Sequence, residues 1–574
     1  MEYQWVKKKQ LEISEYESIK NELAIPDVIA KMLINRGVSS FDEAKEFFRP
    51  SLESLHDPFL MLDMTKAADR LVKAIKNNEK IIVYGDYDVD GTTSVAMMTH
   101  FLKNYSDCIV DYYIPDRYSE GYGVSEIFID SLRSTKPDLV ITLDCGIRAV
   151  ELIKKGSEEG VDFIICDHHE PGKELPPAYA VLDPKRADCD YPFDGLSGCG
   201  VGFKLIQAVL STLDLEESLA FQYLDFLTIS IGADIVPIND ENRILAFHGL
   251  VEINSNPRPG IKSILSLSGL KRAELTIGDV VFVIAPRINA AGRIKHALAA
   301  VEMLLANSEA EATSVCQEIE GYNKERRSVD KEITAEALQR VKSDDFYLNS
   351  HSTVVWKEGW HKGVIGIVAS RLIENYYKPT IVLTEKEGVA TGSARSVKGL
   401  DIHKLLIETG DLLIKYGGHE MAAGLSIKAE NLPIFRDQFE KAVIKETGER
   451  PLSPEIEVEI ELDFKDITAK LYRLIHQFSP FGPKNMTPLF VTRNVKDAGN
   501  SKVVGEAKDH LKLSLKQPVS GDVYFSGIAF KQADKFEYLK SGKSVDIVYA
   551  IGMNEWNGNK TLQLEVKDLK PSVI

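Results

Sequence analysis

Two apolar stretches in the middle of the chain end in residues that can bind metals. One reads LVITLDCGI and reaches Asp144, and the other reads FIICDHHEP and reaches Asp167, His168 and His169. A strand that carries acids and histidines into a protein interior is costly, because buried charges must be paired or coordinate a metal ion. The two stretches therefore predict a metal site.

The same order of strand, turn and helix occurs three times. An apolar run at 81–84 leads into the acidic turn GDYDVDG and a helical stretch, and similar units begin at 139 and 163. Such repetition predicts a doubly wound parallel sheet, whose ligand crevice lies at the carboxyl ends of the strands. A further apolar run, LTISIG, predicts one more strand end. The acids and histidines at these ends are Asp86, Asp88, Asp90, Asp144, Asp167, His168, His169 and Asp234.

Helix capping is the alternative for these acids, because Asp after a strand is a common N-cap. We accept it for one or two of them, including Asp167. Four successive strand ends of this kind favour metal binding for the others. Asp and His ligands around two closely placed ions favour Mn²⁺ or Mg²⁺, and imidazole suits Mn²⁺ better than Mg²⁺.

The cysteines do not offer a competing metal site. The six cysteines form no CxxC pair, which argues against a zinc ribbon and against a disulfide framework. We expect them to be reduced. Cys145 and Cys166 lie beside the predicted ligands, and we expect them to pack as small hydrophobic residues.

Length and composition predict a multidomain protein of the cytoplasm. The chain has 574 residues, which suggests about three or four domains. No apolar run is long enough for a membrane helix, and the N-terminus lacks a signal-peptide core, so we expect no membrane partner. The net charge is −17, yet residues 470–574 hold 16 Lys and Arg against 10 Asp and Glu. The acidic total therefore does not exclude a nucleic acid.

The ordered motifs carry a family resemblance. YGDYDVDGTTS, PDRYSEGYG, LDCG, CDHH and IGADIVP resemble the successive motifs of the DHH phosphoesterase superfamily. RINAAGR and GGHEMAAG make the chain similar to the RecJ-type exonucleases within it, which are specific for single-stranded DNA. The resemblance spans nearly the whole chain and implies a phosphodiesterase with two divalent metal ions, Mn²⁺ or Mg²⁺.

The resemblance also implies a role for each residue of the cluster. Asp144 would bridge the ions and act in catalysis, and Asp88 would hold one of them. The other ion would be held by Asp90, His168 and Asp234.

Two positions need separate comment. His169 would contact the scissile phosphate, or act as an acid, rather than bind a metal ion. Some members of the superfamily have a ligand His at the position four residues before Asp88, where this chain has Tyr84. Asp86 is therefore expected to serve as an additional metal ligand.

The resemblance implies substrate contacts in three regions, since Arg donates in a bidentate manner to phosphate and Gly permits close approach of the backbone. Each has an ordinary alternative: a simple turn at 116–123, surface arginines at 287–293, and a structural histidine in GGH. The predicted substrate-binding residues are Arg117, Arg287, Arg293, Ser393, Arg395, Gly418 and His419.

The predicted fold is α/β, with a parallel-sheet DHH domain, a DHHA1 α/β domain reached through a long helix, and a C-terminal OB-like β-barrel. The predicted boundaries are 1–75 for a helical N-terminal region, 76–295 for DHH, 296–345 for the connecting helix, 346–450 for DHHA1 and 455–574 for the barrel. The basic barrel resembles OB-folds, which bind single strands by stacking. Its candidate aromatic residues could equally be core, with Trp556 the best candidate for exposure; they are Phe481, Phe525, Tyr549 and Trp556.

The resemblance implies a function: metal-dependent 5′ to 3′ hydrolysis of single-stranded DNA to 5′-mononucleotides, in DNA repair and recombination. A helicase and a single-strand-binding protein are candidate partners besides the DNA. Two alternatives stay open. One is a phosphodiesterase for oligoribonucleotides or cyclic dinucleotides, and the other is a catalytically inactive replication factor that only binds DNA.

Overall fold

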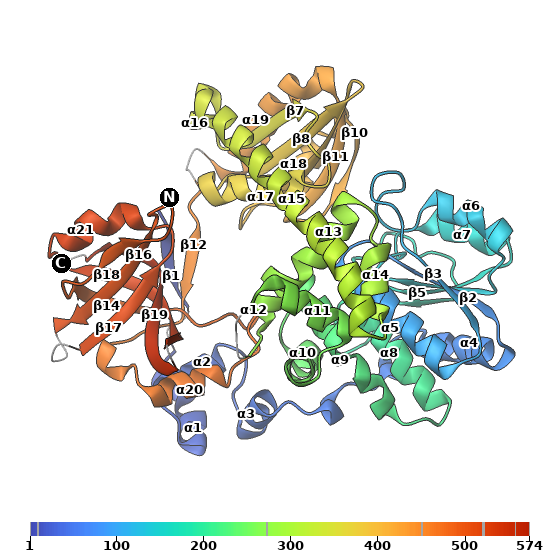
Figure 1. Ribbon diagram of the computed structural model, residues 1–574, viewed down its shortest axis with the longest axis horizontal. Coiled ribbons are helices and arrows are strands. Elements are labelled where there is room, and N and C mark those ends of the chain that lie inside the picture. Colours follow the sequence, from blue (N-terminus) through green and yellow to red (C-terminus); the bar gives the residue numbers. More distant parts are fainter. Residues whose placement is uncertain are drawn as a thin grey trace. The chain divides into compact units, whose positions relative to one another are not determined.

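The computed structural model of the chain describes residues 2–8, 11–270, 274–448, 452–518, 523–556 and 558–572, and it divides into two compact units (Figure 1). The first unit contains residues 56–234 and 249–454. The second contains residues 3–55, 235–248 and 455–574. Each unit is described by itself.

A five-stranded parallel sheet forms the base of the first unit, in the order β3-β2-β4-β5-β6, which confirms the predicted parallel arrangement. Its central strands are apolar on both faces because helices cover both (Figure 1): α4, α5 and α8 on one face, α6 and α7 on the other. The strands are β2 (Lys80–Gly85), β3 (Ile109–Tyr113), β4 (Leu139–Leu143), β5 (Asp162–Cys166) and β6 (Ala180–Leu182). The helices are α4 (Met64–Asn77), α5 (Val89–Tyr105), α6 (Glu126–Thr135), α7 (Val150–Glu158) and α8 (Gly198–Thr212).

The expectation that Asp234 follows a strand is wrong. Asp234 follows helix α9 (Leu224–Ala233), in which every residue from 224 to 232 is buried. A short apolar run that is buried all round has no helical periodicity, so the sequence pattern cannot separate it from a buried strand. The next helices along the chain are α10 (Asp240–Ser255), whose residues up to 248 belong to the second unit, then α11 (Pro259–Ser268), α12 (Ile277–Asp279), a π-helical turn (Val280–Ile284) and α13 (Ala285–Ile294).

The predicted connecting helix is two helices, α14 (Leu298–Leu305) and α15 (Glu309–Ser343). The break has a local cause, because the Ser308 side chain accepts a hydrogen bond from the backbone N–H of Glu311 and so caps α15. No helix in the described ranges combines the length and the apolar character that a bilayer crossing requires.

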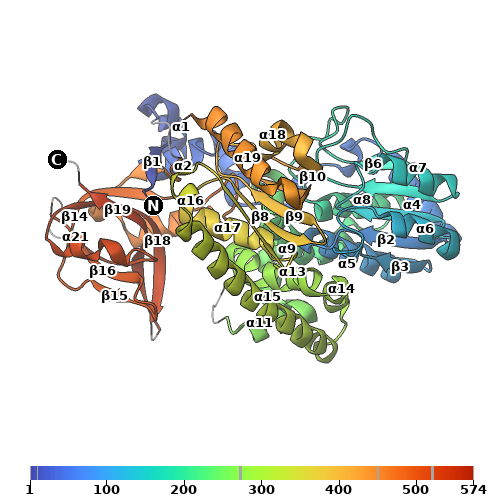
Figure 2. The same cartoon turned by 90° about the horizontal axis from the view of Figure 1, so that it is seen from above.

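A second α/β domain follows in the same unit, with a five-stranded sheet in the order β10-β11-β9-β8-β7. Only β7 and β8 run parallel, and α17, which joins them, packs against β8 and β9 (Figure 2). The elements are α16 (Asp345–Asn349), β7 (Thr353–Glu358), α17 (Ile365–Tyr376), β8 (Thr380–Lys386), β9 (Val389–Arg395), α18 (Ile402–Glu408), β10 (Leu413–Gly418), β11 (Ala422–Lys428) and α19 (Leu432–Thr447).

The second unit is a β-barrel, as predicted. Its sheet has the order β13-β14-β18-β19-β17-β16-β15, and an added pairing between β14 and β16 closes it. The elements are β13 (Ile460–Glu461), α20 (Ala469–His476), β14 (Phe490–Asp497), β15 (Lys502–Val504), β16 (His510–Gln517), β17 (Val523–Ala529), α21 (Phe536–Lys540), β18 (Val545–Trp556) and β19 (Asn559–Pro571).

The N-terminal segment belongs to the barrel unit and is not wholly helical. Strand β1 (Gln4–Lys7) pairs in parallel with β12 (Glu455–Val458) (Figure 1). Helices α1 (Ile13–Leu23), α2 (Asp27–Ile34) and α3 (Phe41–Phe48) follow, and their apolar side chains join the barrel core. The helical pattern was visible in the sequence, whereas a four-residue strand that needs a partner some 450 residues away was not.

The aromatic residues of the barrel differ from the exposed set considered from the sequence. Tyr549 is fully buried, and Phe525 packs edge-to-face on Phe464. Strand side chains alternate between faces, so the outward residue of β17 is Tyr524, which is 58% exposed. The side chain of Trp556 lies outside the described side chains.

A buried arginine ties the segments of the barrel unit together. Arg243 on α10 donates hydrogen bonds to the backbone carbonyls of Phe47, Phe478 and Ser479, at 2.8 to 3.2 Å. Its guanidinium also lies 3.9 Å from the ring centroid of Phe47. The side chain of Arg243 thus connects three chain segments, which are α10, the end of α3 at Phe47 and the loop at Phe478.

We expect Arg243→Ala to lower the free energy of unfolding by about 3 kcal/mol, because several buried carbonyls lose their donor. For a unit of this size the midpoint of its thermal transition should fall by roughly 6–12 °C. Differential scanning calorimetry measures this midpoint, and the exposed Arg49→Ala is the control. Equal midpoints for both variants would contradict the structural role of Arg243.

Candidate active site

His168 lies at the centre of the acidic cluster predicted from the sequence. Its Nε2 atom is 3.2 Å from Oδ1 of Asp144, 3.6 Å from Oδ2 of Asp234 and 3.7 Å from Oδ2 of Asp90. Among the described residues, two groups of three potential ligands occur, and both contain His168. One group adds Asp144 and His169, and the other adds Asp90 and Asp234. The structure therefore brings the predicted ligands of β4, β5, α5 and α9 together.

The protonation states of the cluster are unusual. Burial lowers the pKa of His168 to about 3, so its ring is neutral at neutral pH. Burial and the charge of Asp88 raise the pKa of Asp90 to about 6. Burial and the charges of Asp90 and Asp88 raise the pKa of Asp144 well above its usual range. Crowded carboxylates of this kind favour a cation among them.

The donor set fits divalent ions. The buried Nε2 of His168 makes no hydrogen bond to any described residue, although three carboxylates face it. A neutral imidazole with a free nitrogen lone pair and several carboxylate oxygens is a ligand set suited to Mn²⁺ and Mg²⁺. Asp90, Asp144, His168 and Asp234 are the residues that would hold them.

The first turn of α8 fixes the carboxylate of Asp90. The backbone N–H groups of Gly198 and Cys199 donate to its two oxygens at 2.7 and 2.8 Å, and the Ser230 hydroxyl donates at 2.7 Å. The exposed N–H groups at a helix N-terminus are natural partners of an anion. The orientation of Asp90 is thus set before any ion binds.

Asp144 occupies a strained position against the same helix. Its φ of 58° lies in the left-handed region, which costs about 1 kcal/mol for a residue other than Gly. Its backbone N–H donates to the Cys166 carbonyl at 2.9 Å, which holds the turn after β4. A Cβ atom on Gly198 would lie 2.5 Å from the Asp144 Cβ and 2.7 Å from its Cα. Only glycine allows α8 to approach Asp144 this closely.

Asp167 positions its neighbours instead of facing the cluster. One oxygen accepts from the backbone N–H of Ile147 at 2.9 Å, and the other accepts from the His168 N–H and from Nδ1 of His169, at 2.8 and 2.7 Å. Burial opposes the charge on His169, but the hydrogen bond and charge of Asp167 outweigh it and raise the pKa of His169 to about 9. Nε2 of His169 is hydrogen-bonded to the Tyr122 hydroxyl at 2.8 Å.

Asp88 and Asp86 lie outside both groups of potential ligands. Asp88 caps α5, where one of its oxygens accepts from the Gly91 N–H at 3.1 Å. Asp86 is fully buried, and one of its oxygens accepts from the Gly123 N–H at 3.3 Å. Burial and the charge of Asp88 raise the pKa of Asp86 well above its usual range. Metal ligation by these two residues stays a prediction.

Arg117 and Arg293 are held by backbone carbonyls near the site. Nε of Arg117 donates to the Gly292 carbonyl at 3.1 Å, and its guanidinium lies 3.9 Å from the ring centroid of Tyr87. Nη1 of Arg293 donates to the Gly363 carbonyl at 2.9 Å, which links α13 to the second α/β domain. Both side chains keep further N–H donors for a phosphate.

Arg287 has a structural environment. It is 6% exposed, forms an ion pair with Glu320 at 2.8 Å and donates to the Val283 carbonyl at 2.7 Å. These contacts join α13 to α15. The predicted phosphate contact of Arg287 stays a prediction.

The second α/β domain contributes two further groups. On β9, Arg395 donates to the Ser393 hydroxyl at 2.9 Å, and Gly366 of α17 lies against both side chains. At the end of β10, Gly418 has a φ of 147°, and the ring of His419 stacks on His169 with centroids 6.1 Å apart. His419 of the second α/β domain therefore contacts His169 of the CDHH motif.

Sequence reasoning missed four residues of the site. Tyr122 stood in the loop that supplied Arg117, yet nothing marked it as the partner of His169. Ser197, whose hydroxyl accepts a hydrogen bond from Ser230 at 2.7 Å, and Gly198 lie in a glycine-rich stretch, and Ser230 lies in an apolar run. Their signal is a contact with residues more than 30 positions away, which one sequence does not show.

Three family models match the chain. They are the DHH family N-terminal domain at residues 80–231, the DHHA1 domain at 349–445 and the RecJ OB domain at 458–568. The single-stranded-DNA-specific exonuclease RecJ of Bacillus subtilis is 39% identical over 96% of this chain and 69% of its own. The chain belongs to the RecJ family.

Other members of the RecJ family are also similar to this chain. The single-stranded-DNA-specific exonuclease RecJ of Escherichia coli is 30% identical over 99% of this chain and 100% of its own. The crystal structure of Thermus thermophilus RecJ in complex with Mn²⁺ matches with a TM-score of 0.84 and 25% identity, over 100% of this chain and 80% of that one. The predicted resemblance and the predicted fold class are confirmed.

We expect Gly198→Ala to weaken Mn²⁺ binding by about ten- to a hundredfold, because the new methyl group would displace Asp144 and the N–H donor of Asp90. Isothermal titration of the metal-free protein measures the affinity. Gly200→Ala, in the same helical turn but with its nearest neighbours 3.3 Å away, is the matched control. Equal affinities for both variants would show that close packing at Gly198 is not needed.

Proposed function

We propose that this protein is a metal-dependent exonuclease that hydrolyses single-stranded DNA from the 5′ end to 5′-mononucleotides. The observation that carries the proposal is the pair of ligand groups that share His168, in a member of the RecJ family. Bound Mn²⁺ or Mg²⁺ ions would polarise the phosphoryl group and generate hydroxide for attack on it. RecJ of Thermus thermophilus has been crystallised with each of these ions.

We assign the protein's own residues separate roles. Asp144, between His168 and His169, would bridge the ions, and Asp90 with Asp234 would complete one site. His169 is half-buried and holds its proton through Asp167, so its Nε2–H can turn from Tyr122 to a phosphate oxygen. A charged donor at this position stabilises negative charge that develops on the phosphate. His169 would thus contact the phosphate or donate a proton, which are the two roles that the resemblance implies for it.

The proposed substrate contacts are made mainly by arginine side chains. Arg117 and Arg293 can bind phosphate oxygens next to the ions, and Ser393 with Arg395 can bind a further phosphate at the start of α17. The order of these groups along the strand, and hence the 5′ to 3′ direction, rests on the family resemblance. DNA repair and recombination are the matching biological setting.

Three wider assignments belong to the same proposal. A helicase would supply single strands, and a single-strand-binding protein would cover them. The bacterial relatives are exonucleases of DNA, which favours action in the cytoplasm.

The two alternative functions have less support. A DNA-binding factor without activity predicts gaps in the ligand set, whereas all predicted ligands are present and Asp90, Asp144, His168 and Asp234 converge. A phosphodiesterase for short RNA or cyclic dinucleotides has no need of the OB domain, which matches the RecJ OB model over 458–568.

Degradation of end-labelled oligonucleotides tests the proposed activity. With Mn²⁺, a 5′-labelled single strand should release labelled mononucleotide at once, while a 3′-labelled strand should shorten without early release of its label. Blunt duplex DNA and single-stranded RNA should stay intact. Release from the 3′ end, or RNA as the better substrate, would refute the assignment.

The division of roles in the cluster predicts unequal variants. Asp144→Ala should reduce activity to the background of the assay, because a residue shared by both ions is lost. Asp167→Ala should reduce activity by about ten- to a hundredfold, because Asp167 only positions His169 and the backbone after β5. Single-turnover rates on one labelled strand give the comparison. Equal losses would mean that Asp167 itself binds an ion.

A further inference from the structure

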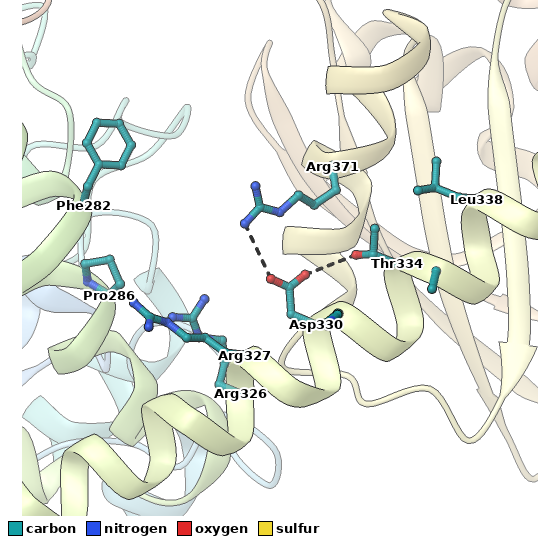
Figure 3. Close-up of a pocket in the computed structure, with 10 residues that line it drawn as sticks. Phe282, Pro286, Arg326, Arg327, Asp330, Thr334, Leu338 and Arg371 are labelled. Carbon is teal, nitrogen blue, oxygen red and sulfur yellow. Dashed lines mark hydrogen bonds and ion pairs between the residues drawn. The ribbon is translucent and has the colours of Figure 1, made fainter. Parts of the chain in front are cut away.

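A basic groove that no step of the proposed reaction uses lies along α15. It has a volume of about 710 Å³, and Figure 3 shows Phe282 and Pro286 on one side and Arg371 of α17 on the other, with the α15 residues from Arg326 to Leu338 between them. A groove of this size can hold a group as large as a nucleotide. Its lining residues are Phe282, Pro286, Arg326, Arg327, Asp330, Lys331, Thr334, Ala335, Leu338 and Arg371.

The charge of the groove is opposite to that of the chain as a whole. Four of its side chains are Arg or Lys, and Asp330 is its single acid, although the net charge of the chain is −17. Asp330 is already engaged, since it lies 3.7 Å from Arg371 and accepts from the Thr334 hydroxyl at 3.2 Å. The groove is therefore suited to an anion.

One of its arginines is buried with an unused donor. Arg326 is 9% exposed, and its Nη2 donates to Oδ1 of Asn323 at 2.6 Å. Within the described residues its Nε–H has no hydrogen-bond partner. A buried donor without a partner is destabilising, and a bound anion would supply the missing acceptor.

The groove continues the arginine cluster of the active site. Helix α13 connects the two, because Pro286 in its first turn lines the groove and Arg293 in its last turn belongs to the active-site arginines. Arg326 of the groove lies on α15, which packs against α13. A negatively charged polymer that enters the active site could extend into the groove without leaving positive surface.

Phe282 gives the groove a stacking platform. Its side chain is 75% exposed, which is rare for phenylalanine, and it belongs to the π-helical turn Val280–Ile284. π-Helical turns are frequent at functional sites. An exposed aromatic ring beside basic residues is the combination with which proteins bind single strands.

We propose that this groove binds single-stranded DNA outside the active site, with a base stacked on Phe282 and phosphates bound by Arg326, Arg327 and Lys331. The inference rests on the proposed function, because it adds a segment to the path of the same substrate. An acidic peptide would meet the same charges. The continuity with the active-site arginines favours the DNA strand.

Fluorescence anisotropy with labelled oligothymidylate tests the groove separately from catalysis. Binding is measured in EDTA, so that no strand is cut. For strands of about 16 nucleotides, Phe282→Ala should weaken binding by about fivefold or more, and Phe282→Leu should behave alike. Phe282→Trp should bind as the wild type does, because it keeps a stacking surface. Cleavage of trinucleotides, which do not reach the groove, should be unchanged in all three.

Removal of a basic residue of the groove should change how the affinity for single-stranded DNA depends on salt concentration. Lys331→Ala should lower the slope of log affinity against log salt concentration by about 0.7, the value for one phosphate contact to a single strand. Lys441→Ala, an exposed lysine of α19 outside the groove, is the matched control and should leave the slope unchanged.

The outcomes are distinct. Long-strand affinity that is unaffected by Phe282→Ala and Lys331→Ala would overturn the proposal, and an acidic peptide that binds in a Lys331-dependent way would then be the occupant. Loss of trinucleotide cleavage in the Phe282 variants would also overturn it, since the residue would then act on the active site. The protein could also bind single strands in a way that depends on Phe282 and Lys331 and yet cut no DNA. That result would refute the proposed function but support the proposed binding site in the groove.

Discussion

Mutual repulsion among buried carboxylates is the constraint on which the catalytic half of this molecule depends. Asp90 and Asp144 lie beside a neutral His168, and their pKa values rise because they are buried and because neighbouring carboxylates, Asp88 among them, add negative charge. Divalent ions supply the positive charge that offsets these carboxylates. The surrounding structure pre-forms this space, so the free energy of ion binding also stabilises the folded first unit.

The scaffold holds the cluster by backbone contacts more than by side chains. Asp90 is fixed by two N–H groups of α8, and Asp144 by a left-handed turn that needs glycine at position 198. Asp167 likewise binds backbone N–H groups on two segments. Such contacts survive most substitutions of neighbouring side chains. The position of the carboxylates therefore depends little on neighbouring side chains, and the fold that supplies these backbone contacts is shared with Thermus thermophilus RecJ at 25% identity.

The sequence predicted the parts of the site that depend on local pattern. Asp144 and His168 could be found because buried strands that end in charged residues are unusual in any fold. Asp234 was found, but on the wrong element, because a fully buried helix shows no period. Gly198 and Tyr549 were not assigned correctly, since their roles depend on what lies opposite them in space. A single sequence records the first kind of information and not the second.

The pairing of β1 with β12 has a consequence for how the chain is made. Residues 4–7 leave the ribosome about 450 residues before their strand partner at 455–458 and before the barrel that packs on α1 to α3. The apolar surface of α1 to α3 therefore stays uncovered while the intervening residues are synthesised. A fragment that ends before the barrel would keep that surface exposed, so the barrel is as much a cover for the first 50 residues as a module of its own.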